Sequence, residues 1–288
     1  MKIVSLLPAA TEIACALGLR EGLVARSHEC DHPEDVGALP ALTRARVDSS
    51  LPSAELDEQV RRIVAERLPI YMLDEARLAG LAPDVVVTQE ACEVCAISYE
   101  QVMGSLRRTA ANARVVSLQP TRLADVLADV VAVAAACGVP ERGRALVEGL
   151  KVRLEGVVRP APRPRVAVVE WLAPPMLAGH WVPDTIAAAG GEPVGPPAGE
   201  PSPYATWDEI RALRADAVVV APCGFDLSRT VEEAGPLRDT LRGLAPRVLL
   251  MDGNAYLNRP GPRLVDAAET IAAWLSGGDV PADRAVPL

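Results

Sequence analysis

The sequence is poor in aromatic residues and has no long uncharged run. Aromatic residues make up 3% of the 288 residues, with a single phenylalanine, so each aromatic side chain is a candidate for a role in a site. No segment free of charged residues reaches the ~18 residues that a membrane-spanning helix needs. The formal net charge is -9, with 29 Lys and Arg against 38 Asp and Glu, which excludes the basic face typical of nucleic-acid binding. The hydrophobic content of 50% is sufficient for a large core.

The first 19 residues have only a superficial similarity to a secretion signal. An apolar run follows Lys2, but Pro8 and Glu12 interrupt it. Glu12 also occupies a position that a lipoprotein cleavage site before Cys15 keeps apolar. The segment instead predicts a short strand and then a helix that begins near Pro8 and ends before Gly18. We therefore expect a chain that keeps Met1, a cytoplasmic location and reduced cysteines.

Short β-rich apolar runs alternate with amphipathic stretches along the chain, a pattern typical of parallel α/β layers. The pattern predicts strands at residues 3–6, 23–26, 84–88, 114–118, 165–169, 217–221 and 248–251. It predicts further helices at residues 53–67, 98–108, 123–137, 141–157, 181–189 and 262–275.

Alternate prolines in residues 159–164 mark a boundary between two lobes, because they fit neither a helix nor a central strand. The α/β alternation restarts after them. We predict an N-terminal α/β lobe over residues 1–138, a connecting backbone helix over 139–160 and a C-terminal α/β lobe over 161–288.

Ligands of parallel sheets gather beyond the carboxyl ends of the strands, and the residues with the most useful chemistry lie there in this sequence. The strand exits carry residues 28–32, 92–95, 170–171, 223–226 and 252–259. With the helix and loop starts near 180 and 204, they supply the candidate ligand-binding residues Glu170, Trp171, His180, Trp181, Tyr204, Trp207, Asp252, Tyr256, Asn258 and Arg259.

Each of these residue types suits a flat or charged ligand. The indoles of Trp171 and Trp181 can stack on a flat ligand, and His180 offers a donor, an acceptor or a metal ligand. Arg259 can pair with a carboxylate or a phosphate. The structural alternatives are a tryptophan cap over the sheet edge, a solvated histidine and an arginine that holds a neighbouring loop.

Cys92 and Cys95 form a Cys-x-x-Cys pair, whose sulfurs can converge on a zinc ion, act as a redox dithiol or serve only in packing. His28, Cys30 and His32 can complete a soft site for zinc or iron. In an extended segment, alternation would place Cys30 on the same side as both imidazoles. All three interpretations of the cysteine pair stay open.

Several motifs resemble those of one protein superfamily. They are Val4-Ser5-Leu6-Leu7-Pro8-Ala9-Ala10-Thr11-Glu12, Ala82-Pro83-Asp84-Val85-Val86-Val87, Glu170-Trp171-Leu172-Ala173-Pro174-Pro175, Gly179-His180-Trp181-Val182-Pro183 and Asp252-Gly253-Asn254-Ala255-Tyr256 with Asn258-Arg259-Pro260. They resemble the helical-backbone (class III) substrate-binding proteins of ABC importers, and within them a leaderless, cobalamin-binding-like subgroup.

The resemblance implies two Rossmann-like lobes with parallel sheets, joined by a long rigid helix and holding a ligand between them. It implies that the aromatic residues at the strand exits form the ligand walls, and that an ABC importer is the partner. The lack of a recognisable leader argues against docking on a periplasmic transporter.

We therefore expect a non-catalytic binding protein for a corrinoid such as cobalamin, or for a related metal-tetrapyrrole or metal chelate, clamped between the lobes. The alternative is a zinc- or iron-dependent or thiol-based enzyme that acts on a small molecule at the Cys/His cluster. The sequence leaves the ligand's identity and the oligomeric state open.

Overall fold

The computed structural model describes residues 1–89, 102–104 and 113–288, and the chain divides into two compact units. The N-terminal unit contains Met1–Leu51, Glu58–Pro120 and Leu127–Glu148, and the C-terminal unit contains Pro52–Asp57, Thr121–Val126 and Gly149–Leu288. The division falls within three helices, which are α2 (Ser53–Ala65), α5 (Leu123–Ala136) and α6 (Pro140–Glu155). The lobe limits expected from the sequence, at residues 138 and 160, remain a prediction.

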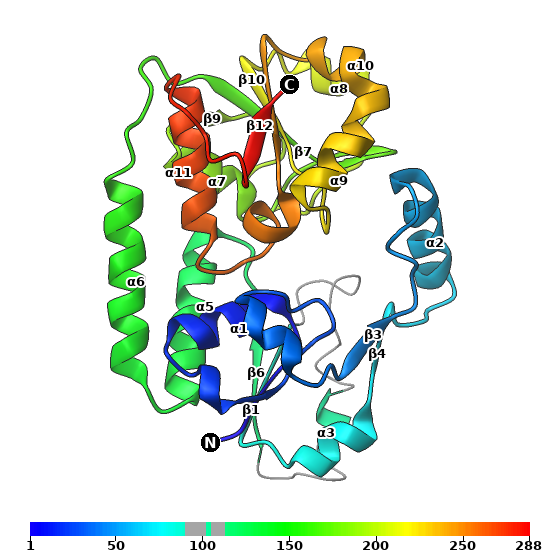
Figure 1. Cartoon of the computed structure of the whole chain (residues 1–288). Helices are drawn as coiled ribbons and strands as arrows, with labels where there is room; N and C mark the ends of the chain where they lie inside the picture. Colours follow the sequence, from blue (N-terminus) through cyan, green and yellow to red (C-terminus); the bar gives the residue numbers. More distant parts are fainter. Residues whose placement is uncertain (90–101, 105–112) are drawn as a thin grey trace. The chain divides into compact units, whose positions relative to one another are not determined.

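The N-terminal unit is built on a parallel sheet of four strands in the order β2-β1-β5-β6. Figure 1 labels β1 and β6 of this sheet. These strands are β1 (Ile3–Ser5), β2 (Leu23–Ala25), β5 (Val85–Gln89) and β6 (Arg114–Leu118). An antiparallel ribbon of β3 (Thr43–Ala45) and β4 (Tyr71–Leu73) accompanies the sheet. The described part of this unit also contains α1 (Pro8–Ala16), α3 (Glu75–Leu81) and the 3-10 turns Arg20–Gly22 and Glu34–Ala38.

Successive strand residues point to opposite faces of this sheet, and each face packs into a core of its own. Ile3 packs in the core that α1 and α5 cover, whereas its neighbour Val4 packs in the core that includes Leu78 of α3. A strand covered on both faces needs a continuous apolar run, and Val85, Val86 and Val87 of β5 supply one.

The C-terminal unit contains a second sheet in the order β12-β11-β10-β7-β8, with β9 paired to the start of β7. The strands β9, β7, β10 and β11 run parallel, and β8 and β12 are antiparallel. The strands are β7 (Arg165–Leu172), β8 (Pro175–Leu177), β9 (Glu192–Pro193), β10 (Ala217–Val220), β11 (Arg247–Met251) and β12 (Ala285–Pro287). The helices are α7 (Val182–Ala188), α8 (Trp207–Ala212), α9 (Leu227–Ala234), α10 (Arg238–Arg242) and α11 (Leu264–Leu275), with a 3-10 turn at Gly235–Leu237 and a π-helical turn at Gly253–Leu257.

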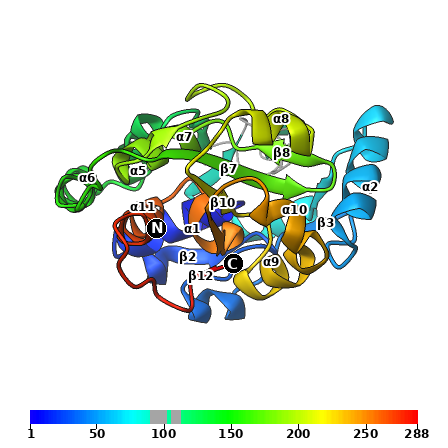
Figure 2. The same ribbon diagram turned by 90° about the horizontal axis from the view of Figure 1, so that it is seen from above.

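Alternate residues of this sheet enter two different cores. Val166, Val219 and Leu249 pack with α7 and α11, whereas Val169 and Val220 pack with α8, α9 and α10. Figure 2 shows α7 and α11 on one side of this sheet and α8, α9 and α10 on the other. Because helices cover both faces of this sheet, a ligand can reach it at the carboxyl edge, where the loops that follow the strands lie.

The expected α/β class with parallel sheets is confirmed, and each predicted strand is present. The strand predicted at 165–169 continues to Leu172, because it forms a hairpin with β8. The predicted helix at 98–108 lies largely outside the described residues. The short strands β3, β4, β8, β9 and β12 were not predicted, since they have two or three residues each and do not lie in the longer apolar runs that marked β1 and β2. None of the helices in the described residues is both long and apolar enough to cross a membrane.

Gly253, just after β11, allows the exits of β10 and β11 to meet. A Cβ atom at this position would lie 2.3 Å from the carbonyl oxygen of Pro222 and 2.7 Å from the carbonyl carbon of Ala221. We predict that Gly253→Ala lowers the free energy of unfolding by about 2 kcal/mol, because backbone atoms must move apart. Urea denaturation measures the change.

Gly235→Ala is the matched control. Gly235 has helical dihedral angles, and a Cβ atom there would meet no heavy atom within 4 Å. Its unfolding free energy should change by less than about 1 kcal/mol. Equal stability of the two variants would show that the close approach at Gly253 is not needed.

Candidate functional site

Trp171 lies at the carboxyl end of β7, where that strand extends beyond the sheet as a hairpin with β8. The pairing register shifts between Val169 and Trp171, so Glu170 is the extra residue of a β-bulge. The indole is half-buried, and its Nε1 donates a hydrogen bond to the carbonyl oxygen of Ala173 at 3.1 Å. The bulge and this bond together direct the indole at the sheet edge.

Phe225 supports the indole of Trp171. It follows β10 directly before α9, is 1% exposed, and its ring centroid lies 5.1 Å from that of Trp171 at an interplanar angle of 52°. Arg229 lies on α9, and its guanidinium carbon is 3.7 Å from the centroid of the Phe225 ring. Trp171 thus packs in a tilted arrangement on Phe225, whose ring is in turn covered by the guanidinium of Arg229.

His180 and Trp181 stand at the start of α7, next to a close backbone contact. A Cβ atom on Gly179 would lie 2.3 Å from the carbonyl oxygen of Glu200, so only glycine fits there. His180 has a left-handed backbone with φ of 50°. Its N–H donates to the carbonyl oxygen of Glu200 at 2.7 Å, and its carbonyl accepts from the N–H of Gly199 at 2.9 Å. These bonds hold a conformation that costs free energy for a non-glycine residue.

The side chains of this pair lie against each other. The His180 and Trp181 rings are stacked, with centroids 5.8 Å apart and planes at 29°. Trp181 Nε1 donates to the carbonyl oxygen of Leu257, which closes the π-helical turn after β11, at 2.9 Å. Burial lowers the pKa of His180, so its imidazole is neutral at neutral pH and keeps a lone pair for a ligand.

The two indoles have different neighbours. Trp171 packs on Phe225 beside α9, whereas Trp181 packs on the core shared by α7 and α11. Trp181 nevertheless reaches the exit of β11 through its bond to Leu257. The two indoles thus approach the carboxyl edge of the sheet from opposite faces.

The residues after β11 use their polar side chains mainly to hold this turn. Asp252 caps it by accepting a hydrogen bond from the N–H of Ala255 at 2.6 Å. Burial raises the pKa of Asp252. Asn258 Nδ2 donates to the carbonyl oxygen of Ala221 at 2.8 Å, and Arg259, 7% exposed, donates to Asn254 Oδ1 at 3.0 Å.

The remaining candidates of this unit also have partners in the chain. The guanidinium carbons of Arg263 and Arg284 lie 5.4 and 5.3 Å from the centroid of the Tyr256 ring. The Tyr204 hydroxyl donates to Asp57 Oδ1 at 2.7 Å, although the side chain is 52% exposed. Trp207 is the first residue of α8 and packs against the core beside α8, α9 and α10.

In the N-terminal unit, His28 is held by the ribbon of β3 and β4. Its Nδ1 lies 2.6 Å from the hydroxyl of Thr43, and its ring lies 5.2 Å from that of Tyr71. The Tyr71 hydroxyl donates to Glu29 Oε1 at 2.6 Å. Burial, followed by the charge of Arg26, lowers the pKa of His28. His28 is therefore neutral at neutral pH, with one ring nitrogen fixed.

The expected common side for His28, Cys30 and His32 is wrong. The segment is not extended, because the N–H of Cys30 bonds to the carbonyl oxygen of Ser27 at 3.2 Å and closes a turn. Cys30 is 2% exposed and accepts a hydrogen bond from the Thr11 hydroxyl at 3.0 Å, whereas His32 is exposed. The turn removes the period of two on which the expectation rested.

The predicted pair Cys92 and Cys95 lies outside the described residues. Within residues 1–89, 102–104 and 113–288, no three His, Cys, Asp or Glu side chains are grouped to hold a metal ion.

Two supports of the candidate site were not predicted as site residues. Phe225 carried a signal, as the only phenylalanine and at a strand exit. No signal in the sequence marked Arg229, since an arginine in a helix four residues after Phe225 is common in proteins. Its place over the Phe225 ring depends on the fold.

No protein-family model matches this sequence, and no curated protein matches it. Solved structures do match, and three of them are periplasmic proteins that bind vitamin B12 or heme. The chain has the fold of these periplasmic binding proteins, so the fold expected from the sequence resemblance is confirmed.

Three of these structures show how far the likeness extends. The heme-binding protein HutB of Vibrio cholerae has a TM-score of 0.72 at 18% identity, with 96% of this chain and 98% of that chain covered. The heme-binding protein RhuT from Roseiflexus sp. RS-1, in its apo form, has a TM-score of 0.69 at 22% identity, with 96% and 98% covered. The vitamin B12-binding protein BtuF of Vibrio cholerae has a TM-score of 0.65 at 18% identity, with 95% and 96% covered.

The lowered pKa values of His28 and His180 give a testable pH dependence. Because burial disfavours their charged forms, the folded chain binds fewer protons than the unfolded chain just below the ordinary histidine pKa of about 6.5. This contribution to stability is present above that pH and is lost as the pH falls through the folded-state pKa values. Proton NMR titration, assigned with His28→Gln and His180→Gln, should give both midpoints below 6.5. A midpoint at or above that value would contradict the burial of that ring.

Proposed function

We propose that this chain is a binding protein, not an enzyme, whose ligand is a metal-tetrapyrrole and specifically a corrinoid such as cobalamin. The observation that carries the proposal is the carboxyl edge of the C-terminal sheet, where an oriented indole ends β7 and a neutral imidazole precedes α7. Binding proteins for vitamin B12 and for heme share the fold.

The indole of Trp171 suits a flat, largely apolar ligand. Phe225 already packs on the ring, and Arg229 in turn packs on Phe225, so little side-chain entropy is lost when a ligand packs on the indole. Trp181 is likewise fixed, by the bond from its Nε1 to Leu257. We propose that the ligand lies across this edge and contacts both indoles.

His180 suits a ligand that contains a metal. Its imidazole is half-buried and stacked on Trp181, and its backbone is held in the left-handed region by two hydrogen bonds. A neutral imidazole nitrogen binds transition metals and also forms hydrogen bonds to amide or carboxylate groups at the rim of such a ligand. Backbone strain of this kind is common where a side chain meets a ligand.

The choice of a corrinoid over heme rests on the motifs around Glu170, Gly179 and Asp252, which resemble those of the cobalamin-binding-like subgroup. Asp252, Asn258 and Arg259 support the edge rather than the ligand in this proposal. The side chains of Asp252 and Arg259 bond to the turn after β11, and that of Asn258 bonds to the exit of β10. Glu170 remains a candidate for direct contact with the ligand.

The stacking model is tested with Trp171→Ala and Trp181→Ala. Each variant should weaken the binding of cyanocobalamin about tenfold, since stacking and lost apolar contact amount to ~1.4 kcal/mol per indole. Visible absorbance titration of the purified protein measures the dissociation constant.

Trp274→Phe is the matched control. Trp274 lies in α11 under the guanidinium of Arg247, which begins β11 at the amino edge of the sheet. This variant should bind cyanocobalamin as the unaltered chain does. Unchanged affinity in both Trp171→Ala and Trp181→Ala would remove the stacking model.

A comparison of probes tests the ligand class. Cyanocobalamin, hemin and a ferric siderophore are titrated into the same protein. Tightest binding of cyanocobalamin supports the corrinoid proposal. Tighter binding of hemin would overturn the corrinoid and keep the tetrapyrrole, and binding of the siderophore alone would overturn both.

A further inference from the structure

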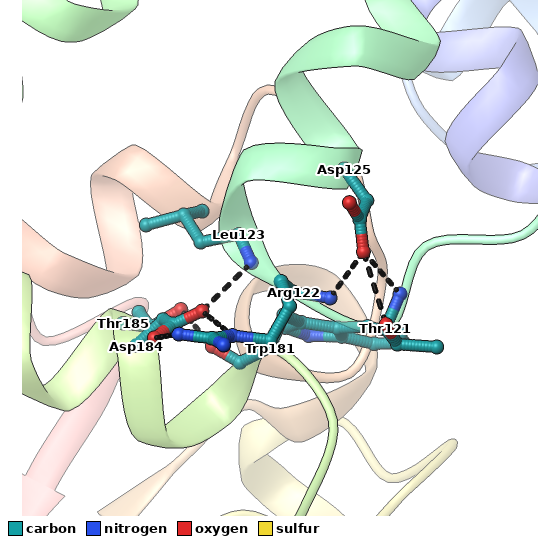
Figure 3. Close-up of polar contacts among 7 residues, drawn as sticks. All are labelled: Thr121, Arg122, Leu123, Asp125, Trp181, Asp184 and Thr185. Atoms are coloured by element: carbon teal, nitrogen blue, oxygen red, sulfur yellow. Dashed lines mark hydrogen bonds and ion pairs between the residues drawn. The ribbon is translucent and has the colours of Figure 1, made fainter. Parts of the chain in front are cut away.

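Arg122, just before α5, belongs to the C-terminal unit and contacts the segments that carry His180 and Trp181. Its Nε and Nη2 donate to Asp184 Oδ2 and Oδ1 at 2.7 and 2.8 Å, so the ion pair is bidentate (Figure 3). The N–H of Leu123 adds a third bond to Asp184 Oδ2 at 3.2 Å. Asp184 is the third residue of α7, directly after the Trp181 cap.

The backbone of Arg122 is itself restrained. Asp125 Oδ2 accepts hydrogen bonds from the N–H of Arg122 at 2.8 Å and from the N–H and hydroxyl of Thr121, both at 3.0 Å. These bonds cap the first turn of α5 and fix the direction in which the arginine leaves the chain (Figure 3). A planar guanidinium on a fixed backbone imposes a geometry on its carboxylate, which a lone charge does not.

The stem of Arg122 also contacts a second segment. A Cβ atom at Gly199 would lie 3.0 Å from Arg122 Cδ, so the loop runs close over the stem. The N–H of Gly199 donates to the carbonyl oxygen of His180. One side chain therefore contacts both the helix turn after Trp181 and the loop that holds the left-handed backbone of His180.

Trp181 is tied to the same turn of α7. Its carbonyl oxygen accepts from the N–H and the hydroxyl of Thr185, at 3.0 and 2.9 Å, and Thr185 follows Asp184 (Figure 3). A shift of Asp184 thus moves the backbone of Trp181, while a shift of Gly199 moves that of His180.

We propose that Arg122 is a positioning residue, which through Asp184 and Gly199 sets the orientation of the His180 and Trp181 rings for the ligand. This inference rests on the proposed function only for its effect on ligand affinity. Its effect on the orientation of Trp181 holds without any ligand.

Arg122→Gln tests the proposal, because glutamine keeps part of the stem and removes the charged fork. The affinity for cyanocobalamin should fall about fivefold to tenfold, and Arg122→Lys should recover part of the loss, since it restores the charge without the bidentate geometry. In a Trp181→Phe background the same Arg122→Gln change should have a smaller effect, because residues that act through each other are not additive.

The ligand-free measurement is tryptophan fluorescence. The signal of Trp181 is the difference between spectra of proteins with and without Trp181→Phe, and this difference spectrum should change when Arg122→Gln is present. If Trp171→Ala and Trp181→Ala both bind cyanocobalamin unchanged, the proposed stacking on the ligand fails, while the fluorescence result still decides whether Arg122 positions Trp181.

Arg153→Gln is the matched control. Arg153 is also a half-exposed arginine of the C-terminal unit paired with carboxylates, Asp266 and Glu269, on α11. It should leave both the affinity and the Trp181 spectrum unchanged, which separates a general loss of an ion pair from positioning. An Arg122→Gln protein with unaltered Trp181 fluorescence and unaltered affinity would overturn the proposal. Equal affinity losses in Arg122→Gln and Arg153→Gln would do the same.

Discussion

The candidate site depends on close backbone contacts at the carboxyl edge of the C-terminal sheet. Gly253 lies against Pro222, and Gly179 lies against Glu200, at distances that leave no room for a Cβ atom. These contacts bring the exits of β10 and β11 together and place His180 beside the loop at Gly199. Because both faces of the sheet are covered by helices, this edge is the place where the unit's aromatic and polar groups can serve a ligand.

Within that frame, a few arginines act as supports rather than as free charges. Arg229 lies on Phe225 and so backs Trp171, Arg259 is buried against Asn254, and Arg122 holds Asp184. The planar guanidinium suits this use, since it stacks on rings and forms paired hydrogen bonds while it remains charged. A chain with two lysines among its 29 basic residues has many such groups available.

The two candidate histidines, His28 and His180, are neutral rings rather than surface charges. Burial lowers the pKa of both His28 and His180, so each presents a neutral ring at neutral pH. Thr43 fixes one nitrogen of His28, and Trp181 stacks on the ring of His180. Orientation of an imidazole by a second group is the usual way in which its other nitrogen is directed at a ligand.

The sequence by itself determined the α/β class and the main strands, because runs such as Val85-Val86-Val87 carry the signal of burial on both faces. It also located the strand exits, since polar and aromatic residues that follow apolar runs can be identified without knowing how the strands pair. Only the tertiary structure decided which of these residues meet. The turn at Ser27 buries Cys30 while His32 is exposed. Phe225, after β10, packs on Trp171 at the end of the neighbouring strand β7, and Arg122 pairs with Asp184 some sixty residues away. Local patterns encode burial and periodicity, whereas such contacts depend on turns and distant pairings that no local pattern contains.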